Sequence, residues 1–532
     1  MKFVARLRKL TLTLGERLWR NARNREMAAP VDSSQWLNGQ SRQDMQNVLK
    51  QDGEHTPVEC PDLSYSLGFL VGRELEWVPD HFVPVSFACP LYAHPNASVA
   101  VSSLEGNAVA VIGEVIHPDH PQVNQSGIAA ALVRSVGNRQ AEIDKLVGRF
   151  VIIDSDRRRG LTIQSDAIGM RSVYFGQRCD DRTIAASAAK LVSRACHGGN
   201  NSKRSGAFRL GYPGIQTPYL GVLRLPPNSL LELDSGALRR FFPIEPIDAC
   251  TINESLDFAL SQAHRVVSGA MKRKPILLSL TAGLDSRTTL AATRGLWPGL
   301  TFFTYRGSDL ASHGRDILVA SDIARTLGLR HLKLDYAELI PDPWVIAAIK
   351  DNSFGSHQHK LACAYHRYFG GHRLVHVRTN LMELARSNLY GYHDAKPEFS
   401  GGPATAHKMA QFYALAGKLK PSDRHVAAFE QYCALTKIND ALNFATAWDL
   451  YFVEHRMGAW HSGIVAESDV AFDTIIAFNS RNIIRRFMGV PQETRFMSES
   501  LRQHLKRLMP EIAQIPINPK VYPDKSTTGL RL

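Results

Sequence analysis

The feature that most constrains this chain is a change of pattern around residues 243–246. Before it, short apolar runs alternate with turn residues, as in β-strands. After it, an apolar run at 276–280 suits a buried parallel strand. The pattern then predicts a helix over 286–294, a strand over 300–305, a helix over 316–327 and a strand over 331–334. This alternation predicts an α/β fold with a doubly wound parallel sheet in the second half.

The first half is predicted to be an α+β sandwich of antiparallel sheets. Its strand-like runs are 108–112, 150–153, 161–164, 172–175 and 230–233, and one helical segment spans 128–136. We therefore expect a basic arm and linker over 1–60, the sandwich over 61–245 and the α/β part over 246–532. The region from about residue 403 onward is predicted to be mostly helical.

Length and charge narrow the possible functions. A chain of 532 residues exceeds one compact core, so at least two domains are expected. The formal net charge is +13, from 63 Lys and Arg against 50 acidic residues. This excess favours anionic partners, namely nucleotides, nucleic acid or anionic lipid. Part of it lies in residues 1–25, where apolar residues at helical spacing predict either a peripheral membrane contact or a solvated tail.

The arm does not resemble a secretory signal, because Arg6, Arg8 and Lys9 interrupt any apolar core. No apolar run approaches the ~18 residues that cross a bilayer, so a cytoplasmic location is predicted. The seven cysteines lie far apart, are odd in number and form no CxxC. Disulfides and structural zinc are therefore not expected, and most of the thiols are predicted to be buried.

The stretch 278–289 carries the strongest chemical signal. An apolar strand leads through Thr281, Ala282 and Gly283 into a helix. Small residues allow backbone N–H groups to approach an anion, and the helix N-terminus adds further donors. Ser286 can donate a hydroxyl to the same anion. Asp285 would repel phosphate directly, but it can hold a Mg²⁺ ion that bridges to phosphates.

This stretch resembles the pyrophosphate loop of the asparagine synthetase superfamily, Ser-Gly-Gly-x-Asp-Ser, with residues 281–286 in its six positions. The resemblance implies an ATP-pyrophosphatase domain that uses ATP and Mg²⁺. Phe302 to Tyr305 resembles the second strand of that family, whose backbone recognises adenine. The predicted nucleotide-binding residues are Leu280, Thr281, Ala282, Gly283, Leu284, Asp285, Ser286, Thr304 and Tyr305. Residues 478–481 and 508–510 resemble the helical end of the synthetase.

Residues 146–154, 166–174, 185–190 and 223–227 resemble the glutaminase half of asparagine synthetases, which has an N-terminal-nucleophile (Ntn) hydrolase fold. Such a glutaminase needs a cysteine at its mature N-terminus. Here Met1 begins the basic arm and the first cysteine is Cys60. We therefore expect a degenerate, non-catalytic domain, as in the β-lactam synthetases and lasso-peptide cyclases, which use an amine already in the substrate.

A second departure concerns the loop Ser-Gly-Glu-Gly-Ser-Asp-Glu, which supplies an acid and a metal-binding Asp in relatives. Aligned on its last acid, the loop places Glu383 at that position, Met382 at the Asp and Thr379 at the first Glu. We expect either that Asp285 and Glu383 hold Mg²⁺ with more water on the ion, or that the site has lost adenylation. Arg378 and Arg386 are expected to neutralise the charge of a substrate carboxylate or of pyrophosphate. The alternative is a surface ion pair between Glu383 and Arg386 at helical spacing.

The predicted catalytic residues are Glu383, Arg386 and Lys520. Lys520 resembles a late lysine of the family that stabilises charge during acyl transfer, although an exposed tail lysine is the alternative. The histidines at 357, 359, 366 and 372 are interpreted as strand or loop surface residues rather than a metal site. Residues 448–457 are interpreted as a packed helix, with Glu454 and Arg456 as buried ion-pair partners.

The function predicted from sequence is an ATP-dependent, AMP-forming ligase. It would adenylate a small-molecule or peptide carboxylate and pass the acyl group to an amine or ammonia. A non-catalytic nucleotide-binding scaffold is the main alternative. An RNA-modifying ATP-pyrophosphatase ranks last, and no nucleic acid partner is expected.

Overall fold

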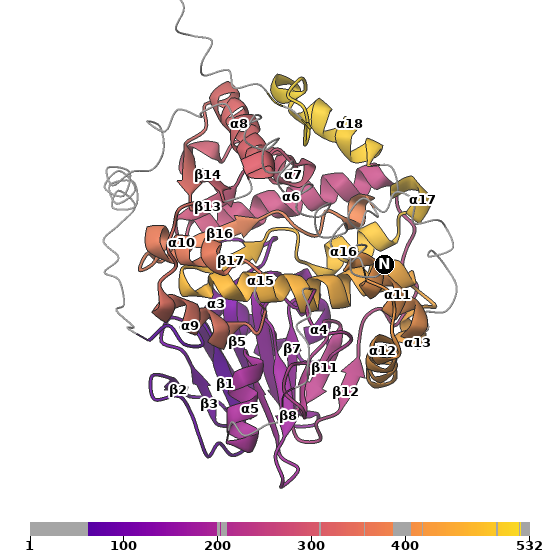
Figure 1. The fold of residues 1–532 in the computed structure, drawn as a ribbon. Helices are drawn as coiled ribbons and strands as arrows, with labels where there is room; N and C mark the ends of the chain where they lie inside the picture. Colours follow the sequence, from indigo (N-terminus) through magenta and orange to yellow (C-terminus); the bar gives the residue numbers. More distant parts are fainter. Residues whose placement is uncertain are drawn as a thin grey trace, which may run out of the picture.

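In the computed structural model (Figure 1) the residues described are 62–198, 203, 210–307, 310–355, 357–386, 406–417, 419–495, 498–520 and 522. The basic arm, its predicted membrane contact and Cys60 lie outside these residues. The six described cysteines are free, as expected, but only Cys89 and Cys363 are buried, so the prediction that most are buried is wrong. None of the described helices has the length and apolarity needed to cross a membrane.

Two six-stranded antiparallel sheets form the first half, in the lower part of Figure 1. The first has the order β10-β8-β9-β1-β3-β2, with β1 Phe69–Gly72, β2 Val83–Val85, β3 Leu91–Ala93, β8 Tyr174–Gln177, β9 Thr183–Ala186 and β10 Val222–Arg224. The second has the order β12-β11-β7-β6-β5-β4, with β4 Val99–Leu104, β5 Asn107–Ile116, β6 Val147–Asp156, β7 Gly160–Ser165, β11 Ser229–Glu232 and β12 Leu238–Arg240.

The sheets stack face to face with helices outside them. In β5, Ala110 and Ile112 face the core between the sheets, whereas Val109 and Val111 pack beneath helices, because successive side chains of a strand alternate in direction. Helices α3 (Gln125–Arg134) and α4 (Arg139–Lys145) cover the second sheet, and α5 (Ala189–His197) covers the first. The layers are helix, sheet, sheet, helix, so the predicted sandwich is confirmed at this level.

The second half contains a five-stranded parallel sheet of order β15-β14-β13-β16-β17. Its strands are β13 Ile276–Ser279, β14 Thr301–Arg306, β15 His331–Asp335, β16 Val375–Arg378 and β17 Asp473–Ile476. One face packs on α6 (Ile252–Met271), α7 (Leu284–Ala292) and α8 (Leu310–Leu327). The other packs on α10 (His359–Phe369), with α9 (Pro343–Asn352) beside it. Strand order reverses between β13 and β16, which is where open α/β sheets bind ligands.

The C-terminal part is mostly helical, as predicted. Its helices are α11 Ala406–Ala416, α12 Asp423–Thr436, α13 Ile438–Ala441, α14 Ala447–Leu450, the π-helix Tyr451–His461, α15 Ser462–Glu467, α16 Arg481–Met488, α17 Gln492–Arg495 and α18 Glu499–Leu508. Two details differ from the sequence analysis. Strand β17 was not predicted, and the packed helix at 448–457 is largely a π-helix, a form often found at functional sites.

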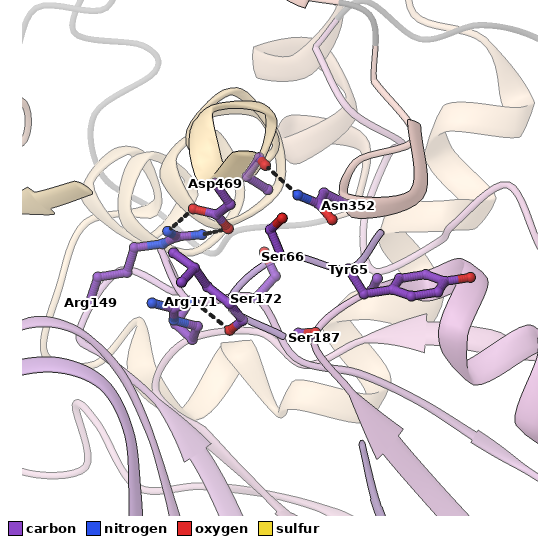
Figure 2. Close-up of a pocket in the computed structure, with 11 residues that line it drawn as sticks. Tyr65, Ser66, Arg149, Arg171, Ser172, Ser187, Asn352 and Asp469 are labelled. Atoms are coloured by element: carbon purple, nitrogen blue, oxygen red, sulfur yellow. Dashed lines mark hydrogen bonds and ion pairs between the residues drawn. The ribbon is translucent and has the colours of Figure 1, made fainter. Parts of the chain in front are cut away.

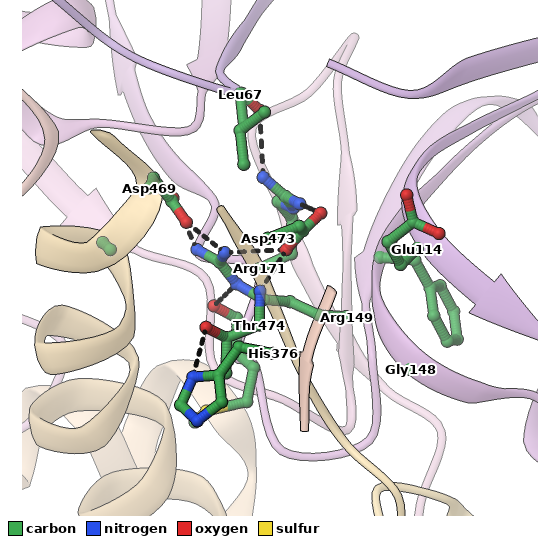
Figure 3. Close-up of polar contacts among 12 residues, drawn as sticks. Leu67, Glu114, Gly148, Arg149, Arg171, His376, Asp469, Asp473 and Thr474 are labelled. Atoms are coloured by element: carbon green, nitrogen blue, oxygen red, sulfur yellow. Dashed lines mark hydrogen bonds and ion pairs between the residues drawn. The ribbon is translucent and has the colours of Figure 1, made fainter. Parts of the chain in front are cut away.

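Buried charges join the two halves (Figure 3). Arg149 of β6 donates to Asp469 and, at 3.1 Å, to Asp473, and Arg171 also donates to Asp473. Arg240 of β12 binds both oxygens of Glu454 in the π-helix, at 2.7 and 2.9 Å. The predicted burial of Glu454 is confirmed, and Arg456 is buried over the Trp460 ring at 3.6 Å. Because charges without partners are costly to bury, these pairs hold the sandwich against β17 and the helical segments of the second half.

Candidate functional site

The loop predicted to bind phosphate connects β13 to α7 at the carboxyl end of the sheet, and its own hydroxyls brace it. Leu280 N–H donates to the Phe303 carbonyl at 2.8 Å, continuing the β13–β14 pairing. The Ser286 hydroxyl accepts from Thr281 N–H at 3.2 Å and donates to the Thr281 carbonyl at 3.0 Å. Gly283 N–H donates to the Thr281 hydroxyl at 3.1 Å. Ser286 therefore shapes the loop in this structure.

Two distant segments also hold the loop. Ala282 N–H donates to the Asp316 carboxylate of α8 at 2.9 Å. The Ala282 carbonyl accepts from Asn518 N–H at 3.1 Å, and the Arg287 guanidinium donates to the carbonyls of residues 515 and 516 at 2.8 and 2.7 Å. Lys520 follows on this tail, so its backbone lies near the loop, but its side chain is exposed. Asp316 and Asn518 carried no local sequence signal, since tertiary packing alone brings them here.

Asp285 and Glu383 come together beside Arg386. Arg386 donates from one nitrogen to both Asp285 oxygens, at 2.8 and 2.7 Å. The proposed Glu383–Arg386 surface pair is therefore wrong. Burial is the main cause that raises the pKa of Asp285, and repulsion from Glu383 raises it further. The positive charge of Arg386 opposes this rise. The Asp285 side chain is 28% exposed, so solvent still reaches the ion pair between Asp285 and Arg386.

One oxygen of Glu383 has no partner. Within the described ranges, the buried Oε2 atom accepts no hydrogen bond. A buried carboxylate oxygen without a donor is costly unless a cation compensates it. Magnesium commonly binds through one or two carboxylates, completed by water and phosphate oxygens. Asp285 and Glu383 are therefore two carboxylates that could hold Mg²⁺. No group of three or more acidic, His or Cys side chains suited to a metal occurs in the described part of the chain.

The other predicted nucleotide contacts lie on neighbouring positions of β13, α7 and β14. Leu280, Ala282 and Leu284 are buried, so they can contribute only backbone groups. The Thr304 hydroxyl lies inside the sheet and donates to the Leu280 carbonyl at 2.7 Å. The Phe303 carbonyl faces β13. On a strand, the backbone N–H and C=O groups of residues two apart point to the same neighbouring strand. The backbone groups of Tyr305 therefore point the same way as those of Phe303, toward the loop that follows β13.

The segment after β16 closes the other side of the switch point. Thr379 shares a hydrogen bond with Thr289 of α7. Asn380 Oδ1 lies 2.9 Å from His461 Nε2, which links the segment to the π-helix. Met382 is fully buried in the core and cannot bind a metal from there. Asn380 and His461 were missed in the sequence, since they are 81 residues apart.

The four histidines do not form a cluster of their own. His359 and His366 lie on α10, so the strand-or-loop interpretation is wrong for them. His366 Nδ1 lies 3.0 Å from the Val470 carbonyl and His359 Nε2 lies 2.9 Å from the Gly355 carbonyl. These contacts are structural, because they join α10 to adjacent segments.

Two cavities lie between the halves, away from the loop. The first measures about 10 Å³ and is lined by Ser66, Arg171, Asn352 and Asp469, among others (Figure 2). This is room for about one water molecule, and the buried Arg171 Nε and Asn352 Oδ1 atoms have no hydrogen-bond partner among the described residues. The second measures about 520 Å³ and opens at the amino ends of β16 and β17. None of the predicted site residues lines either of these cavities, so neither cavity coincides with the predicted chemistry.

Comparison of the sequence with family models and with curated proteins gave no match.

Proposed function

We propose that this protein is an ATP-dependent, AMP-forming ligase of the asparagine synthetase type, without a glutaminase of its own. The observation that carries the proposal is the pairing of Asp285 with Glu383 beside the 280–286 loop. The pair stands at the strand-order reversal between β13 and β16, where open α/β sheets take their ligands.

In the proposed reaction, phosphates of ATP lie over the loop and the N-terminus of α7. Asp285 and Glu383 would hold Mg²⁺, which supplies charge neutralisation of the phosphates. A substrate carboxylate oxygen bonds to the α-phosphorus, and the bond from that phosphorus to pyrophosphate breaks. An amine nitrogen then bonds to the acyl carbon and AMP leaves, with loss of a proton from the nitrogen. The Lys520 side chain, on the tail beside the loop, is proposed to stabilise charge in this second step.

A backbone detail supports retention of the metal-binding acid. Leu381 has φ 78°, a left-handed conformation that favours glycine. If Leu381 occupies the second Gly of Ser-Gly-Glu-Gly-Ser-Asp-Glu, Glu383 falls on the metal-binding Asp and Asn380 on the first Glu. This register differs by one residue from the alignment made on sequence alone. In this register the metal-binding position keeps an acid, Glu383, whereas the two Glu positions of the family loop carry none.

The layered first half supports descent from a glutaminase. Its helix–sheet–sheet–helix arrangement is that expected of an Ntn hydrolase. Strand β1 begins at Phe69 and is preceded by residues 62–68, none of which is cysteine. The Ser66 hydroxyl donates to the Leu63 carbonyl at 2.6 Å. No thiol therefore precedes β1 among the described residues, which supports an amine supplied by the substrate or by free ammonia.

Two contacts favour a second candidate, a nucleotide-binding scaffold without catalysis. The Ala282 amide, which a phosphate would use, already donates to Asp316. Arg386 likewise occupies the Asp285 carboxylate. Because the protein's own side chains occupy both groups, these contacts favour a site without turnover.

The two candidates differ in acyl-adenylate formation. Hydroxylamine traps acyl-adenylates as hydroxamates, so purified protein is incubated with Mg-ATP, hydroxylamine and a panel of carboxylic acids. If the protein is a ligase, at least one acid should yield hydroxamate and an equimolar amount of pyrophosphate, and Asp285→Asn should form neither. Pyrophosphate release that Asp285→Asn leaves unchanged would rule out this site as its source. The matched control is Asp119→Asn, an exposed acid about half accessible and remote from the loop.

A further inference from the structure

Arg378 lies at the carboxyl end of β16, on the sheet face that packs against α10. It pairs in register with Ile476 of β17. Side chains two apart on a strand share a face, and His376, two residues earlier, contacts the rings of Phe303 and Tyr365 at 5.2 and 6.1 Å. Arg378 therefore stands on the α10 side of the strand ends, whereas Asp285 belongs to α7 on the opposite side.

Among the residues that the structure describes, no group pairs with the charge of Arg378. Across the described residues its guanidinium makes no hydrogen bond and no ion pair, although the residue is half-buried. The buried arginines of the junction differ in this respect, since Arg149 and Arg240 each bind carboxylates. A guanidinium carries five donors in a planar fork that matches carboxylate or phosphate oxygens. An unused fork at a ligand-binding edge points to an anion.

The groups around Arg378 are uncharged at neutral pH. Burial raises the pKa of Tyr305 and Tyr365 and lowers the pKa of His376 and His461, and Arg378 acts on all four. The acid that also acts on Tyr305, Asp316, already accepts from the loop amide. Nothing described here neutralises Arg378, and a neutral polar surrounding leaves its field available to a ligand.

A second donor accompanies it. Asn380, two residues on, uses its Oδ1 atom toward His461. This assignment of the amide leaves the Asn380 NH2 group available on the segment that follows Arg378. The Arg378 guanidinium and the Asn380 amide are two donor groups on one short segment, an arrangement suited to binding an oxyanion.

We propose that Arg378 binds an anionic group of the acyl substrate other than the carboxylate that is adenylated. The substrate is then an acid with a second acidic group, either a carboxylate or a phosphate ester. This inference rests on the proposed function, because it assigns the α10 side to the acid and the α7 side to the nucleotide phosphates. A carboxylate neutralised by a guanidinium is a poorer nucleophile, so the group held by Arg378 is the one that does not react.

Binding measurements test the inference without requiring turnover. The probes are glutarate, O-phosphoserine and the monocarboxylate butyrate, each titrated calorimetrically in the presence of Mg²⁺ and an ATP analogue with a non-cleavable α,β bond. The variants are Arg378→Gln and Arg378→Lys. Arg373→Gln is the matched control, because Arg373 lies just before the other end of β16 and is exposed. Thermal unfolding midpoints verify that each variant is folded.

We expect glutarate or O-phosphoserine to bind more tightly than butyrate, and the preferred one identifies the second group. Arg378→Gln should weaken that probe about 10- to 100-fold, the usual loss for a charge-assisted pair. Arg378→Lys should retain part of the affinity, and Arg373→Gln should leave it unchanged. The affinity for the analogue should be the same in all variants.

The inference is overturned if no probe binds the wild type, if butyrate binds equally well, or if Arg378→Gln leaves probe affinity intact. A loss confined to the ATP analogue would also overturn it and assign Arg378 to the phosphates. The proposed function fails separately, if Asp285→Asn keeps Mg-dependent analogue binding. The probes are therefore also titrated without nucleotide, and those titrations still decide on the anion site in that case.

Discussion

Glu454 is predicted to be the most sensitive single contact between the two halves. Its carboxylate is fully buried and accepts from Arg240 at 2.7 and 2.9 Å, from Asn228 at 3.2 Å and from the Tyr432 hydroxyl. Glu454→Gln preserves the shape but leaves the buried Arg240 guanidinium without a counter-charge. Breaking a buried pair from one side costs about 3–5 kcal/mol of unfolding free energy.

An exposed ion pair between the same two halves serves as the comparison for the stability that the buried pair contributes. Arg265 of α6 and Asp119 lie 3.0 Å apart, and both side chains are about half exposed. Such a pair contributes about 0–1 kcal/mol, because water and salt screen it. Asp119→Asn should therefore shift the unfolding free energy by less than about 1 kcal/mol, while the chemically equivalent Glu454→Gln shifts it several-fold more.

Urea unfolding followed by tryptophan fluorescence gives the comparison for wild type, Glu454→Gln and Asp119→Asn. The double variant Arg240→Met/Glu454→Gln should cost less than the sum of its two single variants, since it removes the unpaired guanidinium. The reasoning is refuted if Glu454→Gln unfolds within about 1 kcal/mol of Asp119→Asn, because burial would then add nothing to the pair.

Two further predictions concern metal and pH. Arg386→Gln should lower the Mg²⁺ concentration needed for half-maximal ATP binding several-fold, because the guanidinium no longer competes for Asp285. The measurement is a Mg²⁺ titration at fixed ATP. A higher Mg²⁺ requirement would make Arg386 a phosphate ligand instead. Acidification from pH 7.5 to 5.5 should destabilise the fold, since burial lowers the pKa of four buried histidines, His94, His376, His455 and His461. They stay neutral when folded but protonate when unfolded below about pH 6.5, which costs about 1.4 kcal/mol each at pH 5.5. His331, whose pKa burial lowers to about 4, adds a further cost of about 1.4 kcal/mol. Glu467 and Asp285, whose pKa values burial raises to about 7, oppose this as they protonate, together returning about 4 kcal/mol. A net loss of roughly 3 kcal/mol is expected from urea unfolding at the two pH values, and equal or greater stability at pH 5.5 would contradict it.

The elements with strong local patterns were predictable. The run 276–280 is apolar, follows a proline and precedes small residues, so β13 and its loop could be located from sequence alone. Helix α6 carries an N-terminal capping box, Thr251 with Glu254, and an apolar stripe. In each case the signal lies within one element and depends on no distant partner.

Strand β17 lacked such a signal. It has four residues, two of which are Asp473 and Thr474, and it lies between helices. Asp473 is buried only because Arg149 and Arg171 of the sandwich reach it. A strand whose polar residues depend on partners about 300 positions away cannot be recognised from local periodicity.

The site was predictable in its parts but not in its pairing. Asp285, Glu383 and Arg386 were each selected from sequence. That Arg386 binds Asp285, 101 residues earlier, depends on β16 lying beside β13. Spacing alone favoured Glu383 as the partner of Arg386. Likewise, a leucine gives no sequence signal for the left-handed turn at Leu381, so the register proposed for this segment depends on the backbone.

Calorimetry of Mg-ATP binding to wild type, Asp285→Asn and Asp119→Asn tests the central claim most directly. The account predicts Mg-dependent binding to the wild type, unchanged in Asp119→Asn and weakened at least about 10-fold in Asp285→Asn, as expected when one of two carboxylate ligands is lost. Binding of equal strength in Asp285→Asn, or no binding by the wild type, would contradict it and leave a scaffold as the better description.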